Sequence, residues 1–391
     1  MIERRKQLRR VQDALSEYPV AVLLGARQVG KTTLARQMVK AWQGETNFFD
    51  LEIESGFAAL TGTPEAVLLG LRGLVVIDEI QRLPKLFATL RPLADRTDNL
   101  ARFLLLGSAS PSMIKGVSES LAGRADFVQV TGLTLDETGE NRQNTLWLRG
   151  GFPRSFLAGS DGQSLKWRRN FITAQVERDI PLLGIQVPSP MLRRFWNMLA
   201  HYHGQIWNAE ELGRSLGVTG KTVRHYLDIL AGTFLVRVLP PWSENLGKRQ
   251  VKSPKVYVRD SGLLHAFLGI ETMSGLQSHP KYGASWEGFA MEQVLAHTDV
   301  FQPYFWATSQ GAEVDLLLER DGRRMGIEFK CADAPAMTKS IHVALADLRL
   351  DRMLVVYPGD RRYSLHPKVT ALPLSEAVHD LSEVSFPRQS Q

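Results

Sequence analysis

The stretch Gly25-Ala26-Arg27-Gln28-Val29-Gly30-Lys31-Thr32 decides the fold of this chain. Two glycines and a Lys-Thr pair at this spacing form a P-loop, whose backbone N–H groups point at phosphates while the lysine meets the β- and γ-phosphates. An apolar run precedes the motif and a helical pattern follows it, which disfavours the alternative of a chance glycine-rich turn. We predict that ATP binds to Gly25, Ala26, Arg27, Gln28, Val29, Gly30, Lys31, Thr32 and Thr33.

A pair of acidic residues, Asp78 and Glu79, follows the apolar run Leu74–Ile77. In P-loop enzymes the acidic residue at this strand end holds Mg²⁺, together with the P-loop hydroxyl, here Thr32. Glu79 is then placed to polarise the attacking water, a role for a carboxylate near the γ-phosphate but not on the metal. The alternative is that the two acids cap the next helix. We predict Mg²⁺ at Thr32 and Asp78, and a catalytic base at Glu79.

Two further residues are candidates for the same site. Ser108 follows the apolar run Phe103–Leu106 and resembles the polar sensor residue of AAA-type ATPases. Arg124 follows Gly123, and an arginine beside the γ-phosphate, often from a neighbouring subunit, stabilises transition-state charge. In the alternative interpretation Arg124 is a solvated loop charge. We include Ser108 among the nucleotide-binding residues and Arg124 among the catalytic ones.

The changing pattern of apolar and polar residues along the chain predicts three domains. In the first third, apolar runs of strand length end in polar residues and alternate with helical segments, which predicts a parallel sheet covered on both faces. Helical patterns dominate from residue 146 to 260, and mixed α/β patterns return after that. We predict an α/β fold: an AAA-type ATPase domain at 1–145, a helical winged-helix domain at 146–260 and an α/β domain at 261–391.

Residues 209–227 read as a helix-turn-helix. Gly217 supplies the tight turn, and Thr219 caps a second helix whose apolar face is Val223, Leu227 and Leu230. That spacing turns four polar residues outward, as in a helix that reads a nucleic-acid groove: Lys221, Thr222, Arg224 and His225.

Two apolar runs after these helices, 234–239 and 256–259, are candidate wing strands. The loop between them is basic, with Lys248, Arg249, Lys252 and Lys255. A winged helix with a basic wing contacts phosphates, so we predict DNA or RNA as a partner, with Lys221, Arg224, His225, Lys248 and Arg249 in contact with it. The alternative is a module that contacts only protein.

The segment Glu313–Lys330 predicts a hairpin that turns at Asp321-Gly322. Paired residue numbers then sum to 643, so one face carries Val314, Leu316 and Leu318 against Phe329, Ile327 and Met325. On the other face Asp315 opposes Glu328, and Glu313 opposes Lys330. Opposed carboxylates repel unless a divalent cation lies between them.

The spacing of Asp315, Glu328 and Lys330 also matches the PD-(D/E)xK nucleases, in which two acids hold a metal and the lysine assists the chemistry. We therefore predict Mg²⁺ or Mn²⁺ at Asp315 and Glu328, with Glu287 as a third acid and Asp315, Glu328 and Lys330 as catalytic residues. The alternative is a hairpin with one solvated face, on which Glu313 and Lys330 form an ordinary ion pair.

Composition limits the remaining choices. The 391 residues contain one cysteine, which excludes an internal disulfide and favours a reducing cytosol. The start of the chain lacks the apolar stretch of a signal peptide, and no run approaches the length that spans a bilayer, so we expect no membrane partner. The charge of +6 favours a polyanionic partner only weakly.

The whole chain resembles the prokaryotic predicted ATPases that join an AAA-type domain to a carboxy-terminal domain with a winged helix and a restriction-endonuclease-like fold. The resemblance rests on the motifs above and on the segments 120–124, 177–180 and 256–262. It implies ATP binding at Lys31, Thr32, Asp78 and Glu79, and a nuclease-like centre at Asp315, Glu328 and Lys330. We also expect a homo-oligomer. We expect an ATP-dependent DNA-processing factor. The alternative is a nucleotide-switched regulator that binds a protein partner and keeps the last domain as a scaffold.

Overall fold

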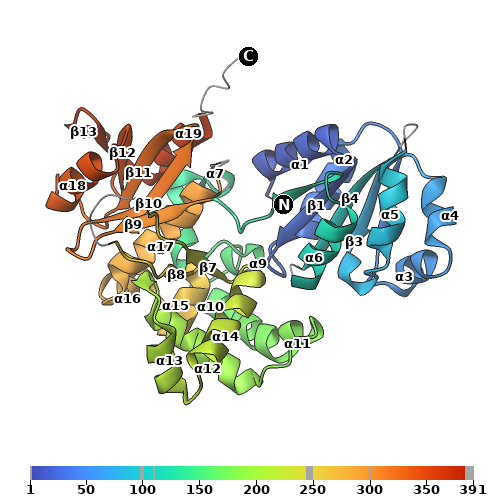
Figure 1. The fold of residues 1–391 in the computed structure, drawn as a ribbon, viewed down its shortest axis with the longest axis horizontal. Coiled ribbons are helices and arrows are strands. Elements are labelled where there is room, and N and C mark those ends of the chain that lie inside the picture. The colour runs from blue at the N-terminus through green and yellow to red at the C-terminus, as the bar shows by residue number, and fades with distance from the viewer. Residues whose placement is uncertain (1, 97–100, 109–110, 244–249, 299–301, 384–391) are drawn as a thin grey trace. The chain divides into compact units, whose positions relative to one another are not determined.

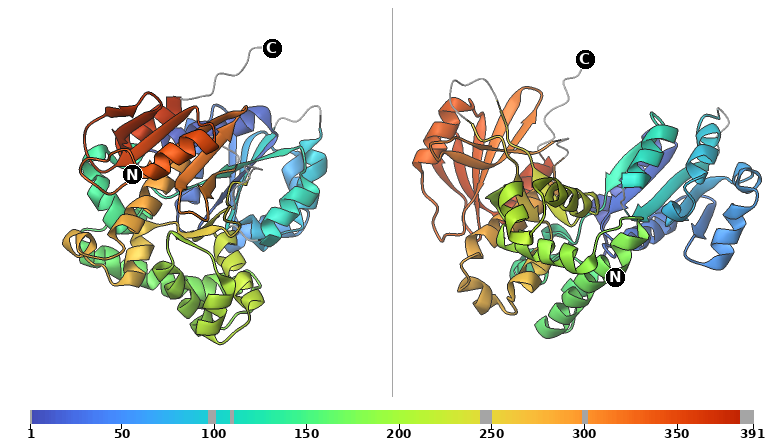
Figure 2. Two further views of the ribbon diagram at one scale, coloured as in Figure 1. Left: turned by 60° about the vertical axis from the view of Figure 1, so that its left-hand side comes forward. Right: turned by 60° about the horizontal axis from the view of Figure 1, so that its bottom comes forward.

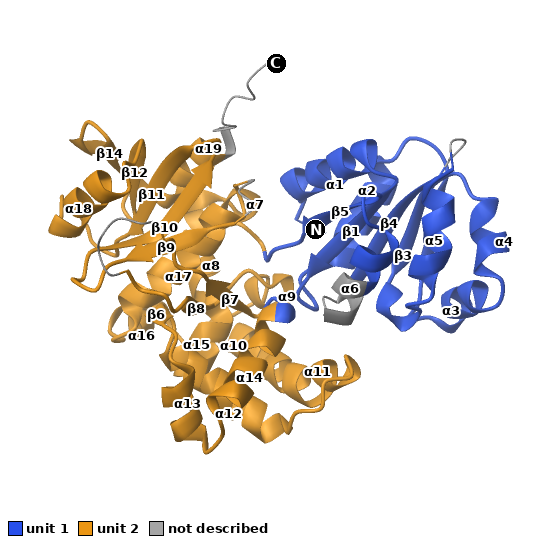
Figure 3. Cartoon of the chain, viewed as in Figure 1, with its two compact units in different colours: residues 1–132, 232–234 blue, residues 133–231, 235–391 orange. Residues whose placement is uncertain are grey.

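The fold is given by a computed structural model that describes residues 2–96, 101–108, 111–243, 250–298 and 302–383 (Figure 1). The chain divides into two compact units (Figure 3). Unit 1 contains Met1–Gly132 and Gly232–Phe234, and unit 2 contains Leu133–Ala231 and Leu235–Gln391. The predicted middle and carboxy-terminal domains fall in unit 2 apart from Gly232–Phe234, and the three-domain division stays a prediction.

Unit 1 is built on a parallel sheet, as the alternating apolar runs predicted. The sheet has the order β2-β3-β4-β1-β5, and every neighbouring pair runs parallel. All six residues of β1 are buried, because helices cover both faces of such a sheet. Its strands are β1 (Val20–Gly25), β2 (Thr46–Asp50), β3 (Gly73–Asp78), β4 (Ala101–Ser108) and β5 (Ala125–Gln129).

The helices of unit 1 form two layers around this sheet (Figures 1 and 2). They are α1 (Arg5–Glu17), α2 (Lys31–Ala41), α3 (Glu54–Thr61), α4 (Pro64–Leu69), α5 (Leu86–Ala94) and α6 (Pro111–Ser120). The four helices from α3 through α6 share one buried apolar cluster with alternate residues of the strands. It includes Leu60, Leu90, Val22, Val75 and Phe103. Helices α1 and α2 cover the other face with Val11, Leu15 and Leu34.

The first part of unit 2 is helical, as the sequence predicted for residues 146–260. Its helices are α7 (Leu135–Thr138), α8 (Gln143–Arg149), α9 (Pro153–Phe156), α10 (Asp161–Ala174), α11 (Ile180–Leu182), α12 (Ser189–His201), α13 (Ala209–Leu216), α14 (Gly220–Gly232), α15 (Ser261–Leu268), α16 (Met273–Gln277) and α17 (Tyr282–Leu295). A turn of π-helix, Gln175–Asp179, joins α10 to α11. Throughout the described ranges, every helix is too short or too polar to cross a membrane.

A small antiparallel sheet lies among these helices. Its order is β6-β8-β7, with β6 (Gln205–Ile206), β7 (Val236–Leu239) and β8 (Lys255–Val258). Strands β7 and β8 correspond to the two predicted wing strands, and Val238 pairs with Val256. The predicted basic loop differs in one respect, because Lys255 belongs to β8 and is buried.

The second part of unit 2 is a mixed six-stranded sheet of order β13-β14-β12-β11-β10-β9 (Figure 1). Its strands are β9 (Tyr304–Ala307), β10 (Glu313–Arg320), β11 (Arg323–Phe329), β12 (Arg352–Tyr357), β13 (Tyr363–His366) and β14 (Val369–Pro373). Helix α18 (Lys339–Asp347) packs Ile341 and Ala344 against one face, and α17 and α19 (Leu374–Glu383) contact the sheet as well.

The predicted hairpin register is correct near the turn and wrong at the open end. Leu316 pairs with Ile327 and Leu318 with Met325, and both turn residues, Asp321 and Gly322, have positive φ. The paired ladder ends at Leu316, so the predicted pairs Val314–Phe329, Asp315–Glu328 and Glu313–Lys330 do not form there.

The cause of this difference is an irregularity in β10. Where β10 pairs with β9, the register shifts by one residue between Val314 and Leu317. Such a bulge moves the residues beyond it to the opposite face of the sheet. Val314 therefore joins Leu317 in the cluster beneath α18 and does not share a face with Leu316.

Candidate nucleotide, helix-turn-helix and carboxylate sites

The P-loop connects the end of β1 to the start of α2, as its motif predicted. Gln28 and Gly30 have φ values of 62° and 106°, which let the backbone turn sharply. Gly25 has to be a glycine, since a Cβ there would lie 2.4 Å from the Val130 carbonyl oxygen. The loop therefore leads into the amino end of an eleven-residue helix, where unpaired N–H groups favour an anion.

Lys31 is held inside this loop. Its Nζ donates hydrogen bonds of 3.0 Å to the carbonyl oxygens of Gly25 and Ala26, and only 6% of the residue is exposed. Burial lowers the pKa of Lys31 to about 8, against the opposing pull of the Glu79 and Asp78 carboxylates. Among the described residues, the hydrogen bonds of this ammonium run to neutral carbonyl oxygens, so a phosphate can attract it away from them.

Thr32 and Asp78 meet across the site. The Thr32 hydroxyl donates a 2.7 Å hydrogen bond to Asp78 Oδ2, and Asp78 is 3% exposed. Burial raises the pKa of Asp78, although bonds from Thr32 and from the Glu79 N–H oppose that rise. A hydroxyl and a carboxylate in contact are oxygen donors of the type that Mg²⁺ takes, so these residues fit the ion of Mg-ATP.

Glu79 has an unusual backbone. Its φ is 56° and its ψ is 41°, the left-handed region that a residue with a side chain seldom adopts. Its carboxylate accepts a hydrogen bond from the Gln81 amide, and burial raises its pKa. Backbone strain of this kind is common at functional sites. The conformation turns the chain directly after β3 and keeps this acid beside Asp78 and Lys31.

Ser108 and Arg124, both predicted to act at the nucleotide site, lie at opposite ends of the strands of the unit 1 sheet. Ser108 ends β4 in register with Gly25, so it lies at the carboxyl ends of the strands with the P-loop, although its side chain is outside the described part of the chain. Arg124 lies at the amino ends of the strands, where its carbonyl oxygen accepts the N–H of Val20. The length of β1, roughly 16 Å at about 3.3 Å per residue, separates the amino end of the strand from the P-loop.

Arg124 is therefore not brought to the nucleotide site of its own chain. Its guanidinium instead forms a two-point ion pair with Asp95, with nitrogen–oxygen distances of 2.5 and 2.8 Å. A third bond runs to the carbonyl oxygen of Ala122. Any role of Arg124 in hydrolysis has to be played on the nucleotide of another chain.

The remaining P-loop residues support the loop. Ala26 and Val29 are buried, and Thr33 lies half-buried in the first turn of α2. Arg27 pairs with Glu52 at 3.4 Å near the surface. These positions agree with a loop whose backbone, and not its side chains, meets phosphates.

The two helices of the predicted helix-turn-helix form at the expected residues. Gly217 has φ 71° between α13 and α14, and the Thr219 hydroxyl accepts the N–H of Thr222 at 3.2 Å. Val223, Leu227 and Leu230 are buried, as the spacing predicted. The opposite face of α14 exposes Lys221, Arg224 and His225, with Thr222 half-buried. Lys248 and Arg249 lie outside the described residues.

The acidic residues of the hairpin do come together, though not by the predicted cross-strand pairing. Asp315 Oδ2 accepts the N–H of Phe329 at 2.9 Å, in place of a ladder bond. Glu328 pairs with Lys330, with Nζ and Oε1 2.5 Å apart. Burial raises the pKa of Asp315 well above its usual range, and the Glu287 and Glu328 charges add to this. Burial also raises the pKa of Glu328.

Lys255, which the sequence placed in the basic loop between the two wing strands, is buried among these carboxylates. Lys255 Nζ forms an ion pair with Glu313, and lies 3.5 Å from Glu287 Oε1 and 3.7 Å from Asp315 Oδ1. Burial alone would lower the pKa of Lys255, but these three carboxylates raise it above its usual value. The Tyr257 hydroxyl donates to Glu287 at 2.6 Å. The predicted Glu313–Lys330 pair is thus replaced by Glu313–Lys255 and Glu328–Lys330.

Asp315 and Glu328, two of the four residues on the face that the alternative interpretation leaves solvated, are buried. They are only 6% and 5% exposed. Glu328 Oε2 is buried without a hydrogen-bond partner among the described residues. Within those same residues, no group of three or more His, Cys, Asp or Glu side chains has the arrangement of a metal site.

Three family models match successive parts of the chain. Residues 17–139 match the AAA domain, residues 140–274 match a domain of unknown function (DUF8612), and residues 282–377 match a second one (DUF4143). The first match identifies unit 1 as a P-loop ATPase domain of the AAA type. The other two descriptions assign no activity, so the restriction-endonuclease-like fold stays a prediction.

Two curated relatives and two solved structures resemble the chain. The uncharacterized proteins Rv2008c of Mycobacterium tuberculosis and Mb2031c of Mycobacterium bovis are each 47% identical to it over 378 residues, which is 97% of this chain and 85% of theirs. The Walker-type ATPase of Pyrococcus abyssi matches 68% of this chain and 96% of its own at 16% identity, with a TM-score of 0.49. The RuvB Holliday junction branch migration motor of Thermotoga maritima matches 61% and 90% at 19% identity, with a TM-score of 0.29. Structural similarity at this level carries no argument about function.

Proposed function

Because this chain belongs to the same family as the two mycobacterial proteins and carries an AAA domain, we propose that it hydrolyses Mg-ATP to drive work on nucleic acid, with DNA as the favoured partner. The observation that carries the ATPase part is the contact of Thr32 with Asp78 at 2.7 Å, beside Lys31 and Glu79. Four side chains of the types that ATP hydrolysis requires converge at the carboxyl ends of the strands, where α2 begins.

In this proposal each side chain has one task. Lys31 leaves its two carbonyl partners and binds the β- and γ-phosphate oxygens, while Thr32 and Asp78 hold the Mg²⁺ that comes with ATP. The ion neutralises charge that develops on the phosphates. Glu79 accepts the proton of the attacking water, a task that its raised pKa favours because the carboxylate then holds a proton more readily.

The nucleic-acid part of the proposal is supported by α14. Its exposed face combines Lys221, Arg224 and His225 on a rigid helix that begins after a tight turn. Helix, turn, helix and a three-stranded sheet are the parts of a winged helix, and such a module meets phosphates with its exposed basic residues.

The double variant Lys221→Ala, Arg224→Ala tests this part. We expect weaker DNA binding and a salt dependence whose slope, log K against log salt, is smaller by about 2, because two phosphate contacts no longer release counterions. Arg36→Ala with Lys40→Ala, a pair of exposed basic residues on α2, is the matched control. An unchanged slope in the α14 variant would favour the regulator that binds a protein partner.

In the homo-oligomer that we propose, Arg124 of one chain completes the nucleotide site of the next. We expect Arg124→Ala to bind ATP normally and to hydrolyse it about a thousandfold more slowly, since an arginine finger stabilises transition-state charge only. Lys31→Ala protein lacks a working site but retains Arg124. Mixing the two inactive variants is therefore expected to restore part of the turnover. If the mixture stays inactive, Arg124 is not a finger.

A metal-dependent nuclease centre at Asp315, Glu328 and Lys330 is the second candidate function. The observation that favours it is the buried Glu328 Oε2, which has no partner among the described residues, beside the Asp315 carboxylate. Carboxylates are the correct donors for Mg²⁺ or Mn²⁺. The cluster as it stands does not fit the ion, however, because the Lys255 ammonium already lies among Glu287, Glu313 and Asp315. We derive no cleavage step from it.

A further inference from the structure

We propose that Lys255 is an internal cation that keeps divalent metal ions out of the carboxylate cluster of unit 2, so that this centre binds a metal only when the ammonium is displaced. The proposal deepens the second candidate function and rests on it. The cluster is defined by its four carboxylates and two lysines: Glu287, Glu313, Asp315, Glu328, Lys255 and Lys330.

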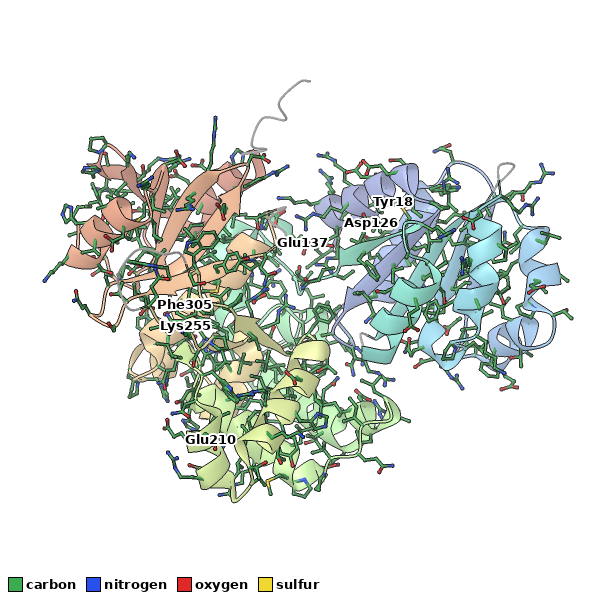
Figure 4. All side chains as sticks on the ribbon, viewed as in Figure 1. Tyr18, Asp126, Glu137, Glu210, Lys255 and Phe305 are labelled. Atoms are coloured by element: carbon green, nitrogen blue, oxygen red, sulfur yellow. The ribbon has the colours of Figure 1, made fainter. Side chains whose placement is uncertain are left out.

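The ammonium of Lys255 is placed as a bound cation would be. Three carboxylates from two elements, α17 and β10, face it within 3.7 Å. The ring of Phe305 in β9 lies beside the same ammonium, 5.6 Å from Nζ to the ring centre, and Figure 4 shows the two labelled side chains as neighbours. Carboxylates together with an aromatic face bind a cation from several sides at once.

The backbone holds Lys255 in this position. Lys255 is the first residue of β8, and it pairs with Ile206 of β6 on one side and Leu239 of β7 on the other. Only 4% of the residue is exposed. An exposed lysine would leave such a cluster freely, whereas this one can leave only if its side chain rotates within a packed interior or if β8 shifts.

The charges of the cluster do not balance. With all six groups ionised, four carboxylates and two ammonium groups leave two negative charges. Lys330 neutralises one side of Glu328, and Glu328 Oε2 has no hydrogen-bond partner among the residues that the structure describes. This buried, unpaired oxygen is the independent observation that points to a cation. The cluster attracts a divalent ion, and Lys255 opposes it.

The opposition follows from electrostatics. An ammonium and a divalent ion that share Glu313 and Asp315 lie within a few ångströms of each other in a poorly hydrated site. Like charges at such a distance repel strongly where water does not screen them. Replacing Lys255 with a neutral side chain raises the negative surplus from two charges to three and opens the position between the carboxylates.

Binding of Mn²⁺ to the nucleotide-free full chain tests the proposal. It is measured by calorimetry and by the electron paramagnetic resonance signal of Mn²⁺. We expect the dissociation constant of Lys255→Gln to be at least about tenfold lower than that of the wild type. Lys255→Arg retains the charge and is expected to bind as weakly as the wild type. Lys252→Gln, an exposed neighbour, is the matched control for loss of a lysine. Adding Asp315→Asn to Lys255→Gln is expected to remove the gain.

Each other outcome is decisive. If wild type and Lys255→Gln bind Mn²⁺ equally well at the cluster, Lys255 does not exclude the metal, and the proposed metal centre stands without it. If neither binds Mn²⁺, both the exclusion and the metal centre are wrong. Should Lys255→Gln and Lys255→Met both fail to fold without metal, Mn²⁺ is expected to restore their circular dichroism signal. Failure of millimolar Mn²⁺ to do so overturns the proposal.

Discussion

Two lysines of this molecule are buried to a similar extent, but their pKa values are shifted in opposite directions. Lys31 in unit 1 is bonded to two backbone carbonyl oxygens, and burial lowers its pKa to about 8. Lys255 in unit 2 faces three carboxylates, which raise its pKa despite burial. The partners of each ammonium, more than its burial, decide whether a ligand can recruit it.

The difference has a functional meaning. Neutral carbonyl oxygens hold Lys31 weakly, so the phosphates of ATP can take it over at little cost. Carboxylates hold Lys255 strongly, and removing the ammonium would leave buried negative charge unpaired. We therefore interpret Lys31 as a residue that exchanges partners during function and Lys255 as one that is fixed until the cluster itself is altered.

The largest effect is expected from Lys255→Gln. Without metal, this variant should lower the free energy of unfolding of unit 2 by about 3–5 kcal/mol, because it leaves buried carboxylates without their counter-charge. Urea denaturation followed by tryptophan fluorescence measures the change, with Lys252→Gln as the control. A loss below about 1 kcal/mol would mean that Lys255 is not a structural counter-charge.

Lys31→Ala is expected to weaken ATP binding by about a hundredfold, or about 2.7 kcal/mol, because the cation for the β- and γ-phosphates is gone. The fold should be unaffected, since the hydrogen bonds that the structure describes for Lys31 run to two carbonyl oxygens, which water can satisfy instead. Titration with a fluorescent nucleotide measures the affinity, and the exposed Lys40→Ala on the same helix is the control. Full affinity in Lys31→Ala would contradict the assignment of the nucleotide site.

The lowered pKa of Lys31 predicts a pH dependence of ATP binding. Well below pH 8 the ammonium is protonated and ready for phosphate, so the affinity for ATP should be level there. Above pH 8 the nucleotide-free protein must first take up a proton, and affinity should fall by about tenfold, or about 1.4 kcal/mol, near pH 9. Lys31→Arg stays charged and should give a level profile over this range. A level profile in the wild type would show that Lys31 has an ordinary pKa.

Asp315→Asn is expected to have the smallest effect, less than about 1 kcal/mol on the free energy of unfolding without metal. The asparagine oxygen can still accept the N–H of Phe329, and Lys255 keeps Glu287 and Glu313. Thermal melting of both proteins without metal measures the change. A loss as large as that of Lys255→Gln would mean that Asp315 is the main partner of the lysine.

The nucleotide site was predictable from sequence because its parts are local. The P-loop is one contiguous stretch that leads from a strand into a helix, and Asp78–Glu79 directly follows the apolar run Leu74–Ile77. The turn at Gly217 and the cap at Thr219 depend on near neighbours in the same way. Short-range patterns of this kind determine the backbone without information from distant segments.

The carboxylate cluster was only partly predictable because its partners are distant in sequence. Lys255 meets Glu287 and Glu313, which are 32 and 58 residues further along the chain. The bulge before Leu317 changes which face Val314 occupies, and no residue type marks it in the sequence. The position of Arg124 at the amino ends of the strands likewise followed only from strand pairing.

The most direct test of the account is single-turnover hydrolysis of ATP by Glu79→Gln, compared with wild type and with the exposed control Glu65→Gln. We expect Glu79→Gln to bind ATP with unchanged affinity and to hydrolyse it at least about a hundredfold more slowly, because an amide cannot accept the proton of the attacking water. Hydrolysis by Glu79→Gln at the wild-type rate would contradict the central claim that the Glu79 carboxylate, beside Lys31 and Asp78, is the catalytic base.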